Sequence, residues 1–147
     1  MKFGVVMDPI GSINFKKDST LSILIEAQSR KHDLIYMEPS SLFLRENGAY
    51  ALTQEIKVRD DSENWFELST ISEMRLSDLD MIVMRQDPPF DANYIYNTYV
   101  LEAAEREEVI VINKPPGVAV QAGTKSFKNI IDAIKNTIKI LKNFISL

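Results

Sequence analysis

Four short apolar runs in this sequence each end in polar residues of the kinds that contact ligands. These endings are Asp8-Pro9, Glu38-Pro39, Arg85-Gln86-Asp87 and Asn113-Lys114. An arginine that directly continues a buried strand needs an anionic partner, because its planar guanidinium pairs with a carboxylate or phosphate through two parallel hydrogen bonds. Arg85 therefore either binds an anionic ligand or pairs with Asp8 or Asp87 to hold the loops, and the spacing favours neither.

Composition removes several other chemistries. The 147 residues include no cysteine, which excludes disulfides, thiolate metal sites and cysteine nucleophiles, and the only histidine is His32. The segment DPIGSINFKKDS has a single glycine and no phosphate-binding loop pattern occurs, so neither dinucleotide binding nor P-loop chemistry is expected. Nothing at the start resembles a signal peptide, and no apolar stretch approaches about 20 residues, so we expect a cytoplasmic protein without a membrane span.

The spacing of apolar side chains predicts the elements that would position these residues. Near-continuous apolar runs indicate strands at KFGVVMD, DLIYME, LDMIVMR and VIVIN. One helix is predicted from Asp18 or Ser19 to about Lys31, and a second over DANYIYNTYVLEAAEREE. One residue in each successive turn marks a face of the second helix: Ile95, Thr98 or Tyr99, and Glu102. Strands that alternate with helices indicate a Rossmann-like α/β fold, with a parallel sheet of about four strands and helices on both faces.

An inserted β-hairpin is predicted between the second and third of these strands. In LFLRENGAYALTQEIKV, Asn47-Gly48 is typical of a type I′ turn, which needs two residues that tolerate positive φ. The following segment, DSENWFEL, predicts a helical turn, and its Trp65 and Phe66 are expected in the core.

Three segments in order resemble the amino-terminal domain of bacterial glutathione synthetase: GVVMDPIGSINFKKDSTLSILIEAQSRKHDLIYMEPSSL, LDMIVMRQDPPFDANYIYNTYVLE and VIVINKP. The resemblance runs from about Lys2 to Pro115 and implies a pre-ATP-grasp domain over residues 1–115. That family joins γ-glutamylcysteine to glycine with ATP and magnesium, through an acyl phosphate. Its amino-terminal domain helps to wall the site of the peptide substrate and supports assembly of an oligomer.

By position in the matched motifs, the resemblance implies a substrate-binding role for Asp8, Ser19, Arg85 and Asp87. Arg85 would meet a substrate carboxylate, and Asp87 would orient Arg85 or accept a hydrogen bond from an amide. In the family, the ATP-grasp domains that hold ATP, Mg²⁺ and most catalytic groups follow this domain, and residues 116–147 are too few to form them. We therefore expect no catalytic residue, no cofactor for this chain alone, and γ-glutamylcysteine or glutathione as a weak ligand.

The tail, residues 116–147, does not continue the synthetase pattern. NKPPGVAVQAGT is similar to the opening of the catalytic domain of pseudouridine synthases, but the HRxD motif that carries the catalytic aspartate of that family is absent, so this activity is not expected. We interpret the chain as a fused or truncated fragment. The alternative is that the tail is a divergent helix of a short homologue. A helix is predicted from Ser126 to about Phe144, with an apolar stripe formed by Phe127, Ile130, Ile131, Ile134, Ile138 and Leu141.

Charge is divided unevenly along the chain. Residues 115–147 hold five lysines and one acid, Asp132, and so carry +4; because the whole chain carries −4, residues 1–114 carry −8. Lysines on one face of a helix are usually only solvated, so nucleic acid is not an expected partner, although an RNA-associated fragment is a third hypothesis. The second hypothesis is a non-catalytic module that forms homo-oligomers or pairs with an intact synthetase.

Overall fold

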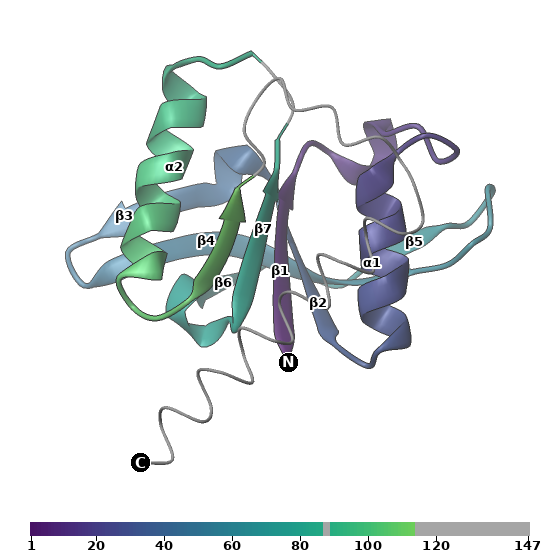
Figure 1. The fold of residues 1–147 in the computed structure, drawn as a ribbon, viewed down its shortest axis with the longest axis horizontal. Coiled ribbons are helices and arrows are strands. Elements are labelled where there is room, and N and C mark those ends of the chain that lie inside the picture. Colours follow the sequence, from purple (N-terminus) through teal and green to yellow (C-terminus); the bar gives the residue numbers. More distant parts are fainter. Residues whose placement is uncertain (87–88, 114–147) are drawn as a thin grey trace.

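The computed structural model describes residues 1–86 and 89–113, which form a mixed α/β sheet with one helix on each face (Figure 1). Four of its strands are parallel and lie in the order β2-β1-β7-β8. They are β1 (Lys2–Met7), β2 (Asp33–Met37), β7 (Met81–Arg85) and β8 (Ile110–Asn113). These are the four strands predicted from the apolar runs, and the predicted α/β, Rossmann-like fold class is confirmed.

The two helices begin where an aspartate caps them. Asp18 accepts a hydrogen bond from the backbone N–H of Thr20 at 2.6 Å and starts α1 (Ser19–Ser29). Asp91 accepts one from the N–H of Tyr94 at 2.9 Å and starts α2 (Ala92–Glu105). Each cap satisfies a donor that has no partner inside the helix. Short 3-10 turns occupy three of the connections: η1 (Ile10–Ser12), η2 (Pro39–Ser41) and η3 (Leu76–Asp78).

Alternate residues of the parallel strands form two hydrophobic clusters, one on each face of the sheet. The cluster under α1 joins Val5 and Val83 to Leu24. The cluster under α2 joins Val6 and Ile82 to Leu101. Gly4 lies on the α2 side, where a Cβ would come within 2.8 Å of both Leu79 Cδ1 and Met37 Cε. The backbone of β1 therefore has side chains packed directly against it.

The inserted region is larger than the predicted hairpin. It contains β3 (Leu42–Arg45), β4 (Gly48–Val58), β5 (Phe66–Leu68) and β6 (Ser72–Arg75), all antiparallel to their partners. β4 has β2 and β3 along one edge and β5 and β6 along the other. Ala51 shows this for β3 and β6, because it pairs with Leu42 on one side and with Met74 on the other. The backbone of Glu55 bonds to Ser69, which follows β5 on the same side as β6. The predicted parallel sheet is thus extended by an antiparallel half.

Two local predictions in this region are wrong. The hairpin joins Arg45 to Gly48 and leaves Glu46 and Asn47 as its loop. The turn is not type I′, because Asn47 is absent from the described non-glycine residues with positive φ, and the positive φ of 139° falls on Gly48 at the first position of β4. DSENWFEL forms no helical turn: Phe66 enters β5, because the outer edge of β4 offers it a hydrogen-bonding partner at Val58.

The expected core position of the two aromatic residues holds in part. Trp65 and Phe66 are half-buried and pack against the cluster under α1. Their rings lie 4.7 Å apart at an angle of 69°, and Phe15 meets Trp65 edge-on at 6.0 Å. These aromatic contacts fix the loop between β4 and β5 beside the start of α1.

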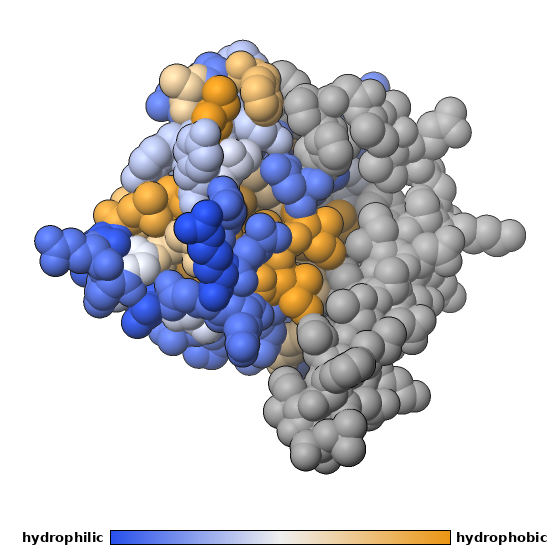
Figure 2. All heavy atoms as spheres, turned by 60° about the vertical axis from the view of Figure 1, so that its left-hand side comes forward, coloured by the Kyte–Doolittle hydropathy of each residue, from blue (hydrophilic) through white to orange (hydrophobic). Residues whose placement is uncertain are grey.

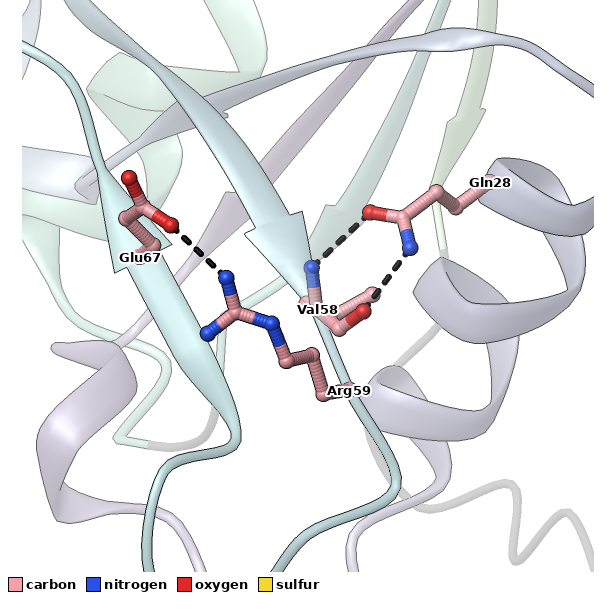
Figure 3. Close-up of polar contacts among 4 residues, drawn as sticks. All are labelled: Gln28, Val58, Arg59 and Glu67. Carbon is pink, nitrogen blue, oxygen red and sulfur yellow. Dashed lines mark hydrogen bonds and ion pairs between the residues drawn. The ribbon is translucent and has the colours of Figure 1, made fainter.

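A side chain from α1 completes the free end of β4. The carboxamide of Gln28 donates to the carbonyl of Val58 at 2.8 Å and accepts from its N–H at 2.9 Å, as a neighbouring strand would (Figure 3). Beside it, Arg59 forms an exposed ion pair with Glu67 at 2.9 Å. The β4 edge is therefore capped by one residue at the point where its pairing with β2 has stopped.

The face of α2 that carries Ile95, Tyr99 and Glu102 points to solvent. The buried face is the neighbouring one, formed by Tyr94, Asn97, Val100, Leu101 and Ala104. Two other predictions, the position of Asp87 and the helix beginning at Ser126, lie outside the described residues. No helix in the described part of the chain is long and apolar enough to cross a membrane.

Candidate functional site

Arg85 lies at the carboxyl end of β7, where its guanidinium reaches the first turn of α1. Its Nε donates to Thr20 Oγ1 at 3.2 Å, and its Nη2 donates to Ser19 Oγ at 2.5 Å. Strand register pairs Arg85 with Met7, so Asp8 follows on the neighbouring strand. Thr20 is only 3% exposed, while Arg85 and Ser19 are half-buried. The guanidinium is therefore held in one orientation by two neighbouring hydroxyl groups.

Charges of both signs meet at this corner. Hydroxyl groups orient the guanidinium of Arg85 but do not neutralise its positive charge. The amino-terminal end of a helix adds a partial positive charge, which Asp18 offsets through its cap on the N–H of Thr20. A carboxylate placed near Arg85 would meet both the planar fork of the guanidinium and the end of the helix.

Tyr36 ties the ends of β1 and β2 together on the same face of the sheet. Its hydroxyl accepts a hydrogen bond from the N–H of Ile10 at 3.2 Å and donates one to Glu38 Oε1 at 3.0 Å. Burial raises the pKa of Tyr36 to about 12, and the negative charges of Glu38 and Asp8 act in the same direction. The phenol therefore stays protonated at neutral pH and holds the loop after Asp8 in place.

Polar side chains also gather on the α2 side of this edge. Asn97, which is buried in α2, donates to Gln86 Oε1 at 3.1 Å, and the hydroxyl of Tyr94 donates to Asn113 Oδ1 at 3.2 Å. These bonds attach α2 to the residues that end β7 and β8. A cavity of about 440 Å³ opens beside them, and its lining includes Ser40, Gln86, Asp91, Asn93, Tyr96 and Asn97.

The sequence-predicted site residues are brought together in part. Ser19 and Arg85 are in direct contact, and Asp8 follows the strand next to Arg85. Asp87 lies outside the described residues. Sequence reasoning missed Thr20 and Tyr36: a small polar residue just after a helix cap and a tyrosine inside an apolar run were the available signals. Within residues 1–86 and 89–113, no group of three or more histidine, aspartate or glutamate side chains is placed to hold a metal ion.

These features place the molecule in the class of open α/β domains with a Rossmann-like sheet, in which ligands bind outside the carboxyl ends of the parallel strands. The carboxyl edge is also where the polar and charged side chains described above converge. The fold thus defines the class of domain, and comparison with known proteins identifies the family within it.

The family model for the N-terminal domain of prokaryotic glutathione synthetase matches residues 1–118. Glutathione synthetases of Buchnera aphidicola subsp. Schizaphis graminum and of Vibrio cholerae are each 48% identical to this chain over 115 residues, and that of Salmonella typhi is 47% identical. The chain belongs to the prokaryotic glutathione synthetase family, in which it corresponds to the N-terminal domain. Each alignment covers 78% of this chain and 36% of the relative, so the chain spans about a third of the length of these proteins.

Proposed function

We propose that this chain is the substrate-side lobe of a glutathione synthetase and does not ligate γ-glutamylcysteine to glycine alone. The observation that carries the proposal is the extent of the match, which covers 36% of the relatives and only their N-terminal domain. ATP and Mg²⁺ would be bound by groups that the rest of a full-length synthetase provides. In this proposal the domain works in the cytoplasm and binds γ-glutamylcysteine or glutathione weakly.

Arg85 is the residue that would bind a carboxylate of the peptide substrate. Its contacts with Ser19 and Thr20 support this role, because they hold the guanidinium at the carboxyl edge of the sheet in a fixed orientation. Asp8 would border the same site from the end of β1. Asp87 would orient Arg85 or accept a hydrogen bond from a substrate amide.

The binding proposal is tested by calorimetric titration of the full chain with γ-glutamylcysteine and with glutathione. We expect Arg85→Lys to weaken binding about tenfold or more, because lysine keeps the charge but loses the two-pronged hydrogen bonding. Arg59→Ala, at the opposite end of the sheet, serves as the control and should titrate like the wild type. Equal affinity of the wild type and Arg85→Lys would contradict the role of Arg85.

The claim of inactivity needs a separate assay. The pure chain, mixed with γ-glutamylcysteine, glycine, ATP and Mg²⁺, should release no phosphate above the rate of a protein-free control. Sustained turnover that depends on both substrates would refute it.

A second candidate function is a module that self-associates or pairs with an intact synthetase. It is favoured by the exposed face of the antiparallel half, where the rings of Phe43 and Tyr50 stack at 6.0 Å and Leu52 is 46% exposed beside them. Arg45 lies over both rings and pairs with Glu73 at 2.6 Å. Sedimentation at increasing protein concentration, with Leu52→Glu as the variant, tests it: a concentration-independent monomer in the wild type argues against this function.

A further inference from the structure

The outward face of α2 carries a row of large side chains that the described residues leave exposed. Ile95 is 38% exposed, Tyr96 44% and Tyr99 60%, and Leu44 of β3, whose N–H donates to the hydroxyl of Tyr96, is 43% exposed. We call these four residues the α2 stripe. Figure 2 shows the side of the molecule on which α2 and β3 lie. Exposed tyrosines beside aliphatic side chains are typical of a surface that another segment covers.

The carboxyl-terminal end of α2 is acidic. Residues 102–108 contain four glutamates and one arginine, for a net charge of −3. Glu102 pairs with Arg106 at 2.7 Å, and Glu107 pairs with Arg75 at 2.8 Å. A segment that covers the α2 stripe and extends past it would therefore gain by carrying positive charge at that end.

A segment of this same chain has the matching pattern. In residues 126–144, which lie outside the described part, four apolar residues are each followed directly by a lysine: the pairs are Phe127-Lys128, Ile134-Lys135, Ile138-Lys139 and Leu141-Lys142. In the helix predicted there, one residue turns the direction by about 100°, so these lysines form a single row along one flank of the apolar stripe. Three of the four lie in the second half of the segment.

The chain leaves the sheet at the correct place for this contact. β8 ends at Asn113, whose side chain bonds to Tyr94 in the first turn of α2. The 12 residues from 114 to 125 can span up to about 40 Å when extended. A helix over residues 126–144 would be about 28 Å long and α2 is about 21 Å, so the predicted helix is long enough to follow all of α2 and to extend past its end. A parallel arrangement then puts the lysine-rich half beside residues 102–108.

We propose that residues 126–144 dock along the α2 stripe, parallel to α2, with their lysine row beside the acidic end of that helix. The inference goes beyond the proposed function, since it concerns how the tail packs and not what the lobe binds. The exposed surface at Tyr50 and Leu52 fits less well. Ala49 and Ala51 of the same strand face the cluster under α2, so the alternate residues Tyr50 and Leu52 lie on the opposite face of the sheet. A second copy of the chain on the α2 stripe is the competing outcome.

Cysteine cross-linking tests the contact directly, because the chain has no cysteine of its own. We expect the full-length double variants Tyr99→Cys/Ile134→Cys and Tyr99→Cys/Ile138→Cys to include at least one that forms a disulfide within the monomer under mild oxidation. The matched control, Leu52→Cys/Ile134→Cys, should not. Tyr99 is exposed, so its replacement leaves the core intact. Rapid disulfide-linked dimers of Tyr99→Cys alone, or no intramolecular bond in either double variant, would overturn the proposal.

A charge exchange provides the second readout. In the cross-linking variant, Lys135→Glu/Lys139→Glu should slow disulfide formation about fivefold, the effect typical of losing exposed ion pairs. Adding Glu102→Lys/Glu105→Lys should restore most of the rate, which a general loss of helicity in the tail would not allow. An unchanged rate of disulfide formation after the first exchange would refute the placement of the lysine row beside the acidic end of α2.

Discussion

The two hydrogen bonds from Gln28 to Val58 make a measurable prediction about stability. Gln28→Ala removes both bonds and leaves the N–H and carbonyl of Val58 without their side-chain partner. A net hydrogen bond contributes about 1 kcal/mol, so the pair is worth about 2 kcal/mol. A cavity of about 460 Å³, lined in part by Gln28, Val58 and Arg59, lets water bond to the vacated backbone groups of Val58. The loss of stability should therefore not exceed about 2 kcal/mol.

Urea unfolding followed by tryptophan fluorescence is the suitable assay. Trp65 is the only tryptophan, and its carbonyl accepts a hydrogen bond from the N–H of Arg59, next to Val58. The free energy of unfolding should fall by about 2 kcal/mol, which corresponds to a thermal midpoint lower by about 4–8 °C for a chain of this size. Gln28→Met, which keeps the length of the side chain but makes neither bond, should lose nearly as much.

The neighbouring ion pair is the matched control. Arg59 and Glu67 are both exposed, at 47% and 59% of the side chain, so Arg59→Ala should cost less than about 0.5 kcal/mol. The two sites are close together in Figure 3, but one bonds to the backbone and the other joins solvated charges. If Gln28→Ala and Arg59→Ala destabilise the protein equally, the reasoning about the β4 edge is wrong.

Three further predictions concern single sites. Gly4→Ala should cost about 1–3 kcal/mol in urea unfolding, because its Cβ would meet Leu79 and Met37 at 2.8 Å, whereas Gly11→Ala, with only Phe66 at 3.9 Å, should be nearly neutral. Burial raises the pKa of Tyr36 to about 12 from 10.0, so its contribution to stability should be complete below pH 10 and decline as the pH rises from about 10 to 12. A Tyr36→Phe variant whose free energy of unfolding falls with pH in this range as steeply as that of the wild type would contradict this. Asp18→Ala should lower stability by about 1 kcal/mol and Asp18→Asn by less, as measured by thermal unfolding, because asparagine can still accept from the N–H of Thr20.

The parallel half of the fold was accessible from sequence because its signals are local. Each buried strand is a nearly continuous apolar run, and each helix starts at an aspartate that satisfies its first N–H groups. The antiparallel half was not accessible in the same way. β5 and β6 have only three and four residues and are half-exposed, which is too short for a periodic signal, so their extended shape is determined by the edge of β4.

The candidate site shows the same division. The position of Arg85 at a strand end could be read from the sequence, but its partners could not, because Ser19 and Thr20 precede it by more than sixty residues. The buried face of α2 was also undecided by spacing. Its two neighbouring stripes both repeat once per turn, and only the packing of Val100 and Leu101 on the sheet shows which one is buried.

β4 has a consequence for how the domain unfolds. In its first half Ala49 and Ala51 face the cluster under α2, and in its second half Ile56 and Val58 face the cluster under α1. One strand therefore belongs to two cores on opposite faces, and neither core can be lost without breaking the pairing that supports the other. The lobe should melt as a single cooperative unit, with the amides of β4 among the last to exchange with solvent.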